Sequence, residues 1–218
     1  MGWLSTYWHF SFADYHDPAN MSWGPLRVFN DDVIQAGKGF GAHPHKNMEI
    51  ITYVLEGELE HQDNQGNQGV IRPGEVQVMS AGTGIVHSEY NRSKSHPVHL
   101  LQIWIMPRTR RLKPRWDQRR FGPEDRGGRL LPVVSAGDVP GTLAIDQDAA
   151  VYVSALRPGQ EAVHKRRDDR RVYLFVIAGR LRVNGQEISQ GDQARIAGEA
   201  ELRLEAVAHT ELILLDLP

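Results

Sequence analysis

GAHPH at residues 41–45 and GIVHSE at residues 84–89 are the two stretches of this sequence that suggest both its fold and its chemistry. The first places His43 and His45 two positions apart. The second does the same with His87 and Glu89. In a β-strand, residues two positions apart point to the same face. Each stretch therefore predicts a strand with two candidate ligands on one face, and two such strands side by side would gather three imidazoles and one carboxylate.

This set of side chains favours a transition-metal site. Imidazoles with one carboxylate suit iron, manganese, nickel, copper or zinc. The chain has 10 histidines and no cysteine, which excludes disulfides, thiolate zinc sites, iron–sulfur clusters and cysteine nucleophiles. Any bound metal must therefore be held by histidine and carboxylate side chains.

The sequence around these stretches is typical of an all-β protein. Turn-forming residues recur about every 8–12 positions, and the apolar runs between them are short and rich in Val, Ile, Tyr and Leu. Ile50–Leu55, Val98–Met106 and Val172–Ile177 are examples. We therefore expect β-sandwich or barrel units in place of helical layers.

The two halves of the chain resemble each other. EGELE at residues 56–60 corresponds to AGRLR at residues 178–182, and each follows an apolar run. This repeat predicts an N-terminal unit over residues 1–107 that carries the metal and a C-terminal unit over residues 129–218. Residues 108–128 are rich in arginine, proline and glycine and are expected to form a linker.

The C-terminal unit is expected to hold no metal. Alignment of the repeats places Lys165 and Arg167 at the positions of the first histidine pair. His164 falls one residue out of phase, and a one-residue offset in a strand turns a side chain to the opposite face. Of the other histidines, His61 lies in a polar stretch and is expected to be solvated. His9, His16, His96 and His99 are expected to be structural.

Charge and hydropathy exclude several classes of function. The net charge is −2, so no general basic field is present and nucleic acid is not an expected partner. No apolar run reaches 18 residues, and the N-terminal stretch lacks a signal-peptide pattern, so a cytoplasmic protein without membrane spans is expected. We expect a monomer. The basic clusters Arg108–Arg120 and Lys165–Arg171 are interpreted as solvated, with a docking role for a protein partner left open.

Several stretches together resemble the pirin family, a branch of the cupins, and are most similar to its shorter bacterial members. They are Phe10–Tyr15, Leu26–Asp32, Gly41–His45, Glu49–Gly57, Met79–Glu89 and Gln102–Ile105. The resemblance implies a bicupin, with two cupin-type β-sandwich or barrel domains in tandem. It also implies that His43, His45, His87 and Glu89 are the metal ligands. Glu49 falls one residue before the usual cupin glutamate, so we expect it to face away from the metal.

The resemblance further implies an activity. Pirins are linked to dioxygenation of flavonols such as quercetin, which would bind Fe(II) through its 3-hydroxy and 4-keto oxygens and react with dioxygen. Manganese, nickel, copper and zinc are alternative metals. Glu89 would then act as a catalytic base, and Phe40, Met48, Ile85 and Trp104 are candidates to line the cavity. A regulatory interaction protein without turnover, and another small-molecule cupin enzyme, are the competing interpretations.

Overall fold

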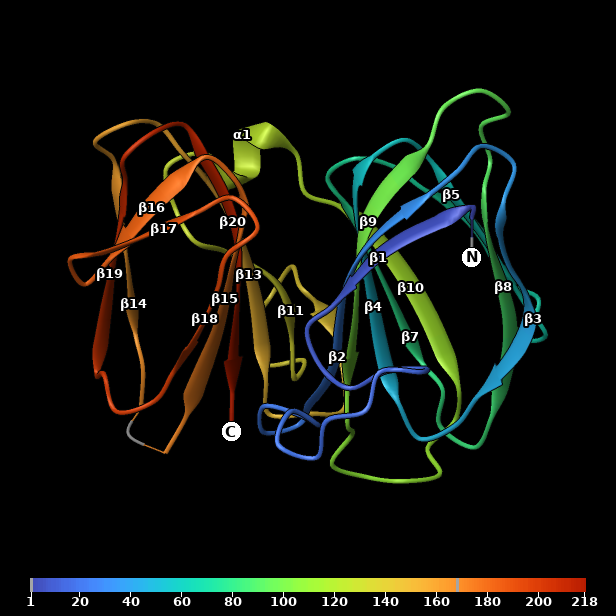
Figure 1. Ribbon diagram of the computed structural model, residues 1–218. Helices are drawn as coiled ribbons and strands as arrows, with labels where there is room; N and C mark the ends of the chain where they lie inside the picture. The colour runs from blue at the N-terminus through green and yellow to red at the C-terminus, as the bar shows by residue number, and fades with distance from the viewer. Residues whose placement is uncertain (1, 168) are drawn as a thin grey trace. The chain divides into compact units, whose positions relative to one another are not determined.

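The regular structure of this chain is almost entirely β. Figure 1 shows the computed structural model, which describes residues 2–167 and 169–218. Among these residues the only α-helix is α1 (Pro123–Arg126), which begins at a proline, as first helical turns often do. No helix in the described part of the chain is long and apolar enough to cross a membrane.

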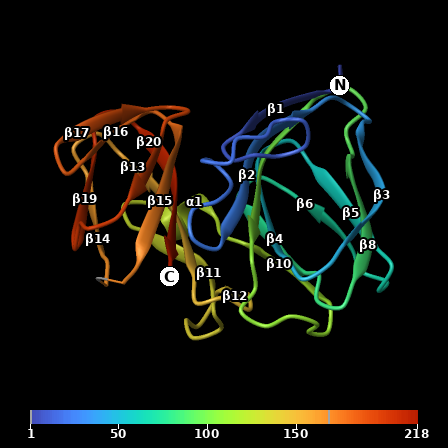
Figure 2. The same ribbon diagram turned by 60° about the horizontal axis from the view of Figure 1, so that its bottom comes forward.

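The chain divides into two compact units, one formed by residues 1–120 with 145–147 and the other by residues 121–144 with 148–218. Each unit combines a six-stranded sheet with a four-stranded sheet (Figures 1 and 2). The prediction of an all-β protein with two sandwich units in tandem is confirmed. Residues 108–128, expected as a linker, include a strand of the first unit and the helix α1 of the second.

The first unit is built from ten strands. They are β1 (Leu4–Trp8), β2 (Leu26–Ile34), β3 (Gly39–His45), β4 (Glu49–Glu56), β5 (Leu59–Asp63), β6 (Gln68–Ile71), β7 (Glu75–Ser80), β8 (Ile85–Asn91), β9 (Val98–Ile105) and β10 (Arg115–Arg120). The larger sheet has the order β1-β2-β9-β4-β7-β10, and the smaller sheet has the order β3-β8-β5-β6.

The interior of the first unit is layered. One apolar cluster contains Val54 and Leu100, and another contains Ile50 and Met79. Thr52 lies between Ile50 and Val54 on β4, and because side chains alternate along a strand it shares their face. The register places Thr52 opposite both Gln77 on β7 and Gln102 on β9. A polar band therefore crosses the larger sheet between two apolar clusters.

The second unit repeats this plan with strands β11 (Leu131–Ser135), β12 (Leu143–Ala144), β13 (Ala150–Leu156), β14 (Glu161–Lys165), β15 (Arg171–Ala178), β16 (Arg180–Val183), β17 (Gln186–Ser189), β18 (Gln193–Ile196), β19 (Glu201–Ala206) and β20 (Thr210–Leu217). Its sheets have the orders β12-β11-β13-β20-β15-β18 and β14-β19-β16-β17. Leu174, at the position of Thr52, pairs with Leu214. The polar band is thus replaced by apolar packing.

A glycine marks the same point in both repeats. Gly57 and Gly179 follow β4 and β15 and have φ of +78° and +82°. A Cβ atom at either position would collide with backbone, the carbonyl of Pro97 in one case and that of His209 in the other. Only glycine combines this conformation with such close approach, which explains why the two turns share it.

Candidate metal centre

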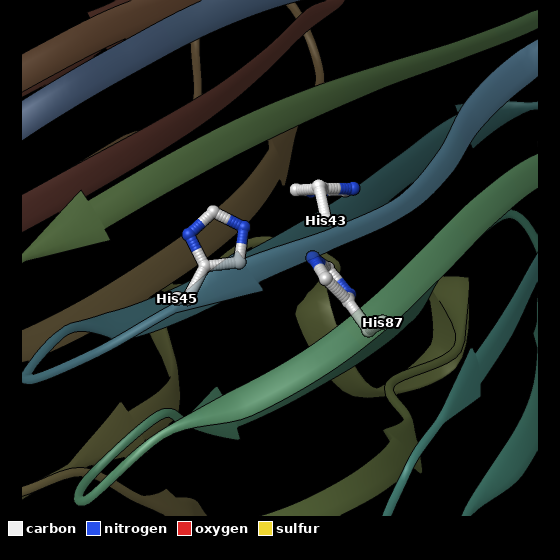
Figure 3. A group of neighbouring side chains, drawn as sticks. All are labelled: His43, His45 and His87. Carbon is white, nitrogen blue, oxygen red and sulfur yellow. The ribbon is translucent and has the colours of Figure 1, made fainter.

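Three of the predicted ligands come together at one point of the smaller sheet of the first unit. β3 and β8 pair in antiparallel register, with His43 opposite His87. One ring nitrogen from each of His43, His45 and His87 lies within 4.8 Å of the other two. Their ring centroids are 4.4–4.9 Å apart. Figure 3 shows the three rings converging from two neighbouring strands, as the spacing of two residues predicts.

The nitrogens of two of these rings are arranged for metal binding. Nδ1 of His43 lies 2.7 Å from the carbonyl oxygen of Gly41, which can accept a hydrogen bond from it and leave the unprotonated Nε2 with a lone pair for a metal. Nε2 of His87 is buried and has no hydrogen-bond partner among the described residues. A buried polar atom without a partner is costly. A metal ion at the centre of the three rings would satisfy it, so the residues present fit a divalent transition metal.

Burial keeps the imidazoles of His45 and His87 neutral. It lowers the pKa of His87 to about 3, with help from the neighbouring His43 and His61. Burial also lowers the pKa of His45 to about 4, together with the neighbouring His87 and His43. Metal ligation needs the unprotonated imidazole, so both rings are in the state that binds a cation.

Glu89, on β8 of the smaller sheet, faces the polar band of the larger sheet. Its side chain is buried and accepts hydrogen bonds from Gln102 Nε2 at 2.8 Å and Gln77 Nε2 at 3.3 Å, while the Thr52 hydroxyl donates its one proton to Gln102 Oε1 at 2.9 Å. A carboxylate oxygen of Glu89 lies within 4.8 Å of ligand atoms of His61 and His87. Glu89 thus adjoins the three-histidine group through His87, and its membership of the ligand set stays a prediction.

The expectation for His61 is wrong. The side chain is fully buried on β5, with His61 opposite Glu89 in the register and its ring stacked on Trp116 at 5.6 Å. The sequence shows a spacing of two residues here too, between His61 and Asp63. The turn residues that follow, Asn64 to Gly66, made the whole stretch look like a loop, although the strand continues to Asp63 before the turn begins.

The structure also places Glu49 and the four side chains expected to line the cavity. Glu49 is buried away from the histidines, where it accepts a hydrogen bond of 2.5 Å from Ser80. Trp104 packs edge-on against His45 at 4.9 Å, and Phe40 lies 6.3 Å from His43. The other two expected lining residues belong to the apolar cluster around Ile50, with Ile85 buried and Met48 packed against it.

The second unit has a different set at the corresponding place, and the alignment used above is wrong by one residue there. His164 on β14 is buried, whereas Lys165 is exposed. The connection between β14 and β15, residues 166–170, is longer than that between β3 and β4, residues 46–48, which shifts the phase. In the second unit, His164 on β14 pairs with Leu202 on β19. At the corresponding place in the first unit, His43 on β3 pairs with His87 on β8. A leucine thus stands where the first unit has the buried His87.

The basic cluster of the second unit is also less solvated than expected. Arg166 and Arg170 are buried. Asp216 accepts hydrogen bonds from Arg170 Nε and from His164 Nε2, the latter at 2.9 Å. Burial raises the pKa of Asp216, but the bonds from His164 and Arg170 outweigh it and hold the pKa below its usual value. A network of paired charges therefore fills this end of the second sandwich.

Comparison with known proteins agrees with this architecture. The family described as Pirin matches residues 1–105, and the Quercetinase C-terminal cupin domain matches residues 132–217. A protein named quercetin 2,3-dioxygenase from Escherichia coli (strain K12) is 48% identical over 217 residues, 100% of this chain and 93% of that protein. A pirin-like protein from Caulobacter vibrioides is 44% identical over 99% of this chain and 93% of that protein.

A known crystal structure is similar along the whole chain. The bacterial pirin YhhW from Escherichia coli, determined in complex with nickel(II), aligns with a TM-score of 0.95 and 47% identity. The alignment covers 100% of this chain and 93% of that one. The bicupin architecture expected from the sequence is therefore confirmed.

Proposed function

The chain belongs to the pirin family, and on that premise we propose that it is a metal-dependent dioxygenase that cleaves flavonols such as quercetin. The observation that carries the proposal is the convergence of His43, His45 and His87, with the buried Nε2 of His87 left for a cation. The name of its 48% identical relative supplies the substrate class. Fe(II) is the proposed metal, and the nickel(II) bound by YhhW supports the kind of site without fixing its ion.

The protein side chains would have two roles, metal binding and proton transfer. His43, His45 and His87 would hold the metal, with Glu89 as the fourth ligand at rest. A bound divalent metal supplies Lewis acidity that makes a chelated hydroxyl more acidic and open positions where substrate and dioxygen meet. Glu89 would take the proton of the flavonol 3-hydroxyl on a carboxylate oxygen. One quercetin and one dioxygen would yield one carbon monoxide and one ester product: the C2–C3 and C3–C4 bonds break, C3 leaves with its own oxygen, and C2 and C4 each gain one oxygen atom of dioxygen.

The polar band would keep Glu89 in place for this transfer. Gln102 and Gln77 donate to its two oxygens from two strands of the larger sheet, so rotation of the carboxyl group would break both bonds at once. Trp104 packs edge-on against one side of His45 and would give a bound flavonol an apolar neighbour. Orientation by rigid strands is what a positioned base requires.

Anaerobic loading with iron, followed by addition of quercetin and oxygen, tests the proposal. We expect loss of the quercetin absorbance with one carbon monoxide released per quercetin consumed. Metal-free protein and the His45→Ala variant are the controls and should leave quercetin intact. Iron-loaded wild-type protein that consumes no flavonol would contradict the proposal and favour a regulatory protein. Consumption without carbon monoxide would favour another cupin chemistry.

A further inference from the structure

We propose that His61 is a positioning residue for the metal site, and that it connects the ligand His87 to the carboxylate of Asp63. The inference rests on the metal site proposed above, and it gives a role to a buried histidine outside the predicted ligand set. Three side chains on two strands form the connection, His87 on β8 and both His61 and Asp63 on β5.

The connection is continuous. Nδ1 of His87 lies 3.4 Å from Nδ1 of His61, and Nε2 of His61 lies 3.3 Å from Oδ2 of Asp63. The side chains of His61 and Asp63 are both fully buried, and His87 is only 2% exposed. Water therefore does not compete for these bonds, and each nitrogen must find its partner inside the protein.

Asp63 sets the direction of the hydrogen bonds. Its carboxylate also accepts from the backbone amides of Gln65 and Asn67 and from Asn67 Nδ2, so it is held as an acceptor. Burial raises the pKa of Asp63, but the hydrogen bonds from Asn67, His61 and Gln65 outweigh it and lower the pKa below its usual value. An ionised carboxylate can only accept.

Because Asp63 is an acceptor, it fixes the tautomer of His61, and His61 in turn fixes the tautomer of His87. Nε2 of His61 must donate to Asp63, so Nδ1 of a neutral His61 is an acceptor. Nδ1 of His87 then donates to it, which leaves the lone pair on Nε2 of His87. That is the buried nitrogen without a partner at the centre of the three rings. The connection thus selects the tautomer of His87 that can bind metal.

The ring of His61 is held in this orientation. It lies parallel to the indole of Trp116, at 5.6 Å and 16°. Nε1 of Trp116 in turn donates to Oε1 of Gln77 at 2.7 Å, and Gln77 donates to Glu89. The same aromatic side chain therefore supports both His61 and the polar band. Partners of this kind orient metal-bound histidines, and their loss typically weakens metal binding roughly 10- to 100-fold.

Zinc affinity tests the inference without any turnover assay. His61→Phe keeps a ring for the stack on Trp116 but removes the acceptor, so competition with a chromophoric chelator should show Zn²⁺ binding weakened roughly 10- to 100-fold. His61→Asn keeps an oxygen near the place of Nδ1 and should recover part of the affinity. The matched control is Ile71→Val, which removes a buried methyl group from the same sheet, in the apolar cluster with Leu59. It should bind Zn²⁺ as the wild type does.

Nitrogen-15 NMR of the zinc-loaded protein adds a readout that a merely structural role would not change. The wild type should show His87 bound through Nε2, with a slowly exchanging proton on Nδ1, and this proton should exchange faster in His61→Phe. Unchanged zinc affinity in His61→Phe, metal on Nδ1 of His87, or metal on His61 itself would each overturn the inference. A lack of flavonol turnover would overturn the dioxygenase proposal alone, whereas wild-type protein that binds no zinc would overturn both.

Discussion

Asp32 offers a direct test of how the interior of the first unit is organised. It lies on β2 and is 4% exposed, and burial raises its pKa to about 7, with the neighbouring charges of Asp31 and Glu89 adding to the rise. The folded state therefore holds a proton on Asp32 between about pH 4 and pH 7 that the unfolded chain releases. More protons are bound when folded, so this group makes the protein less stable as pH rises through that window.

Asp32→Asn removes the titration and keeps the shape. A shift from 3.8 to about 7 corresponds to about 4 kcal/mol at ~1.4 kcal/mol per unit, which sets the upper end of the effect. We expect the metal-free variant to exceed the free energy of unfolding of the wild type by only about 1 kcal/mol at pH 4.5 and by up to about 4 kcal/mol at pH 8. Urea unfolding at a series of pH values measures both proteins, and an unchanged m-value shows that the same transition is compared.

Subtracting the free energy of unfolding of the wild type from that of the variant separates the effect of Asp32 from the effects of the histidines. His45 and His87 have lowered pKa values, so they make the folded state more stable as pH rises and oppose the slope from Asp32. Both proteins contain them, and they cancel. Asp117→Asn, on the exposed face of β10, is the control and should differ from the wild type by less than about 0.5 kcal/mol at every pH. If the free energy of unfolding of Asp32→Asn differed from that of the wild type by the same amount at every pH, the reasoning would be refuted.

Three other predictions address the metal and the second unit. Metal content should persist at pH 6 and fall between about pH 5 and pH 3, because protons compete for His45 and His87 near their lowered pKa values; content that stays flat to pH 3, by elemental analysis, would contradict this. Glu89→Gln should keep most of its metal but lose flavonol turnover roughly 10²- to 10⁴-fold, and unchanged turnover per bound metal would rule out a role as base. Asp216→Asn should lower the free energy of unfolding by about 3–5 kcal/mol, because Arg170 keeps a buried charge; a change below about 1 kcal/mol in urea unfolding would show that the network is not needed.

The spacing of two residues predicted the centre of the site well. His43 with His45, and His87 with Glu89, share a face because strand geometry requires it, and antiparallel pairing then brings His43 opposite His87. The first step is local, but the pairing of β3 with β8 joins segments far apart in the sequence. The pairing of β5 with β8 is of the same kind, and His61 was not recognised because the turn residues after Asp63 made its strand look like a loop.

The phase of β14 and the polar band could not be predicted from a local sequence pattern. The phase of β14 is set by the length of the connection to β15, so alignment on Gly179 placed Lys165 where His164 belongs. The polar band was visible as single polar residues within apolar strands, such as Thr52 between Ile51 and Tyr53. Its meaning appears only when the register brings Gln77 and Gln102 beside it.

Metal content per chain is the measurement that tests the central claim most directly. Elemental analysis of freshly purified wild-type protein and of a His43→Ala, His45→Ala double variant would be compared at equal protein concentration. One transition metal per chain in the wild type, and almost none in the double variant, is the predicted result, because the described ligand groups lie in the first unit. Two metals per chain, or undiminished content in the double variant, would contradict it.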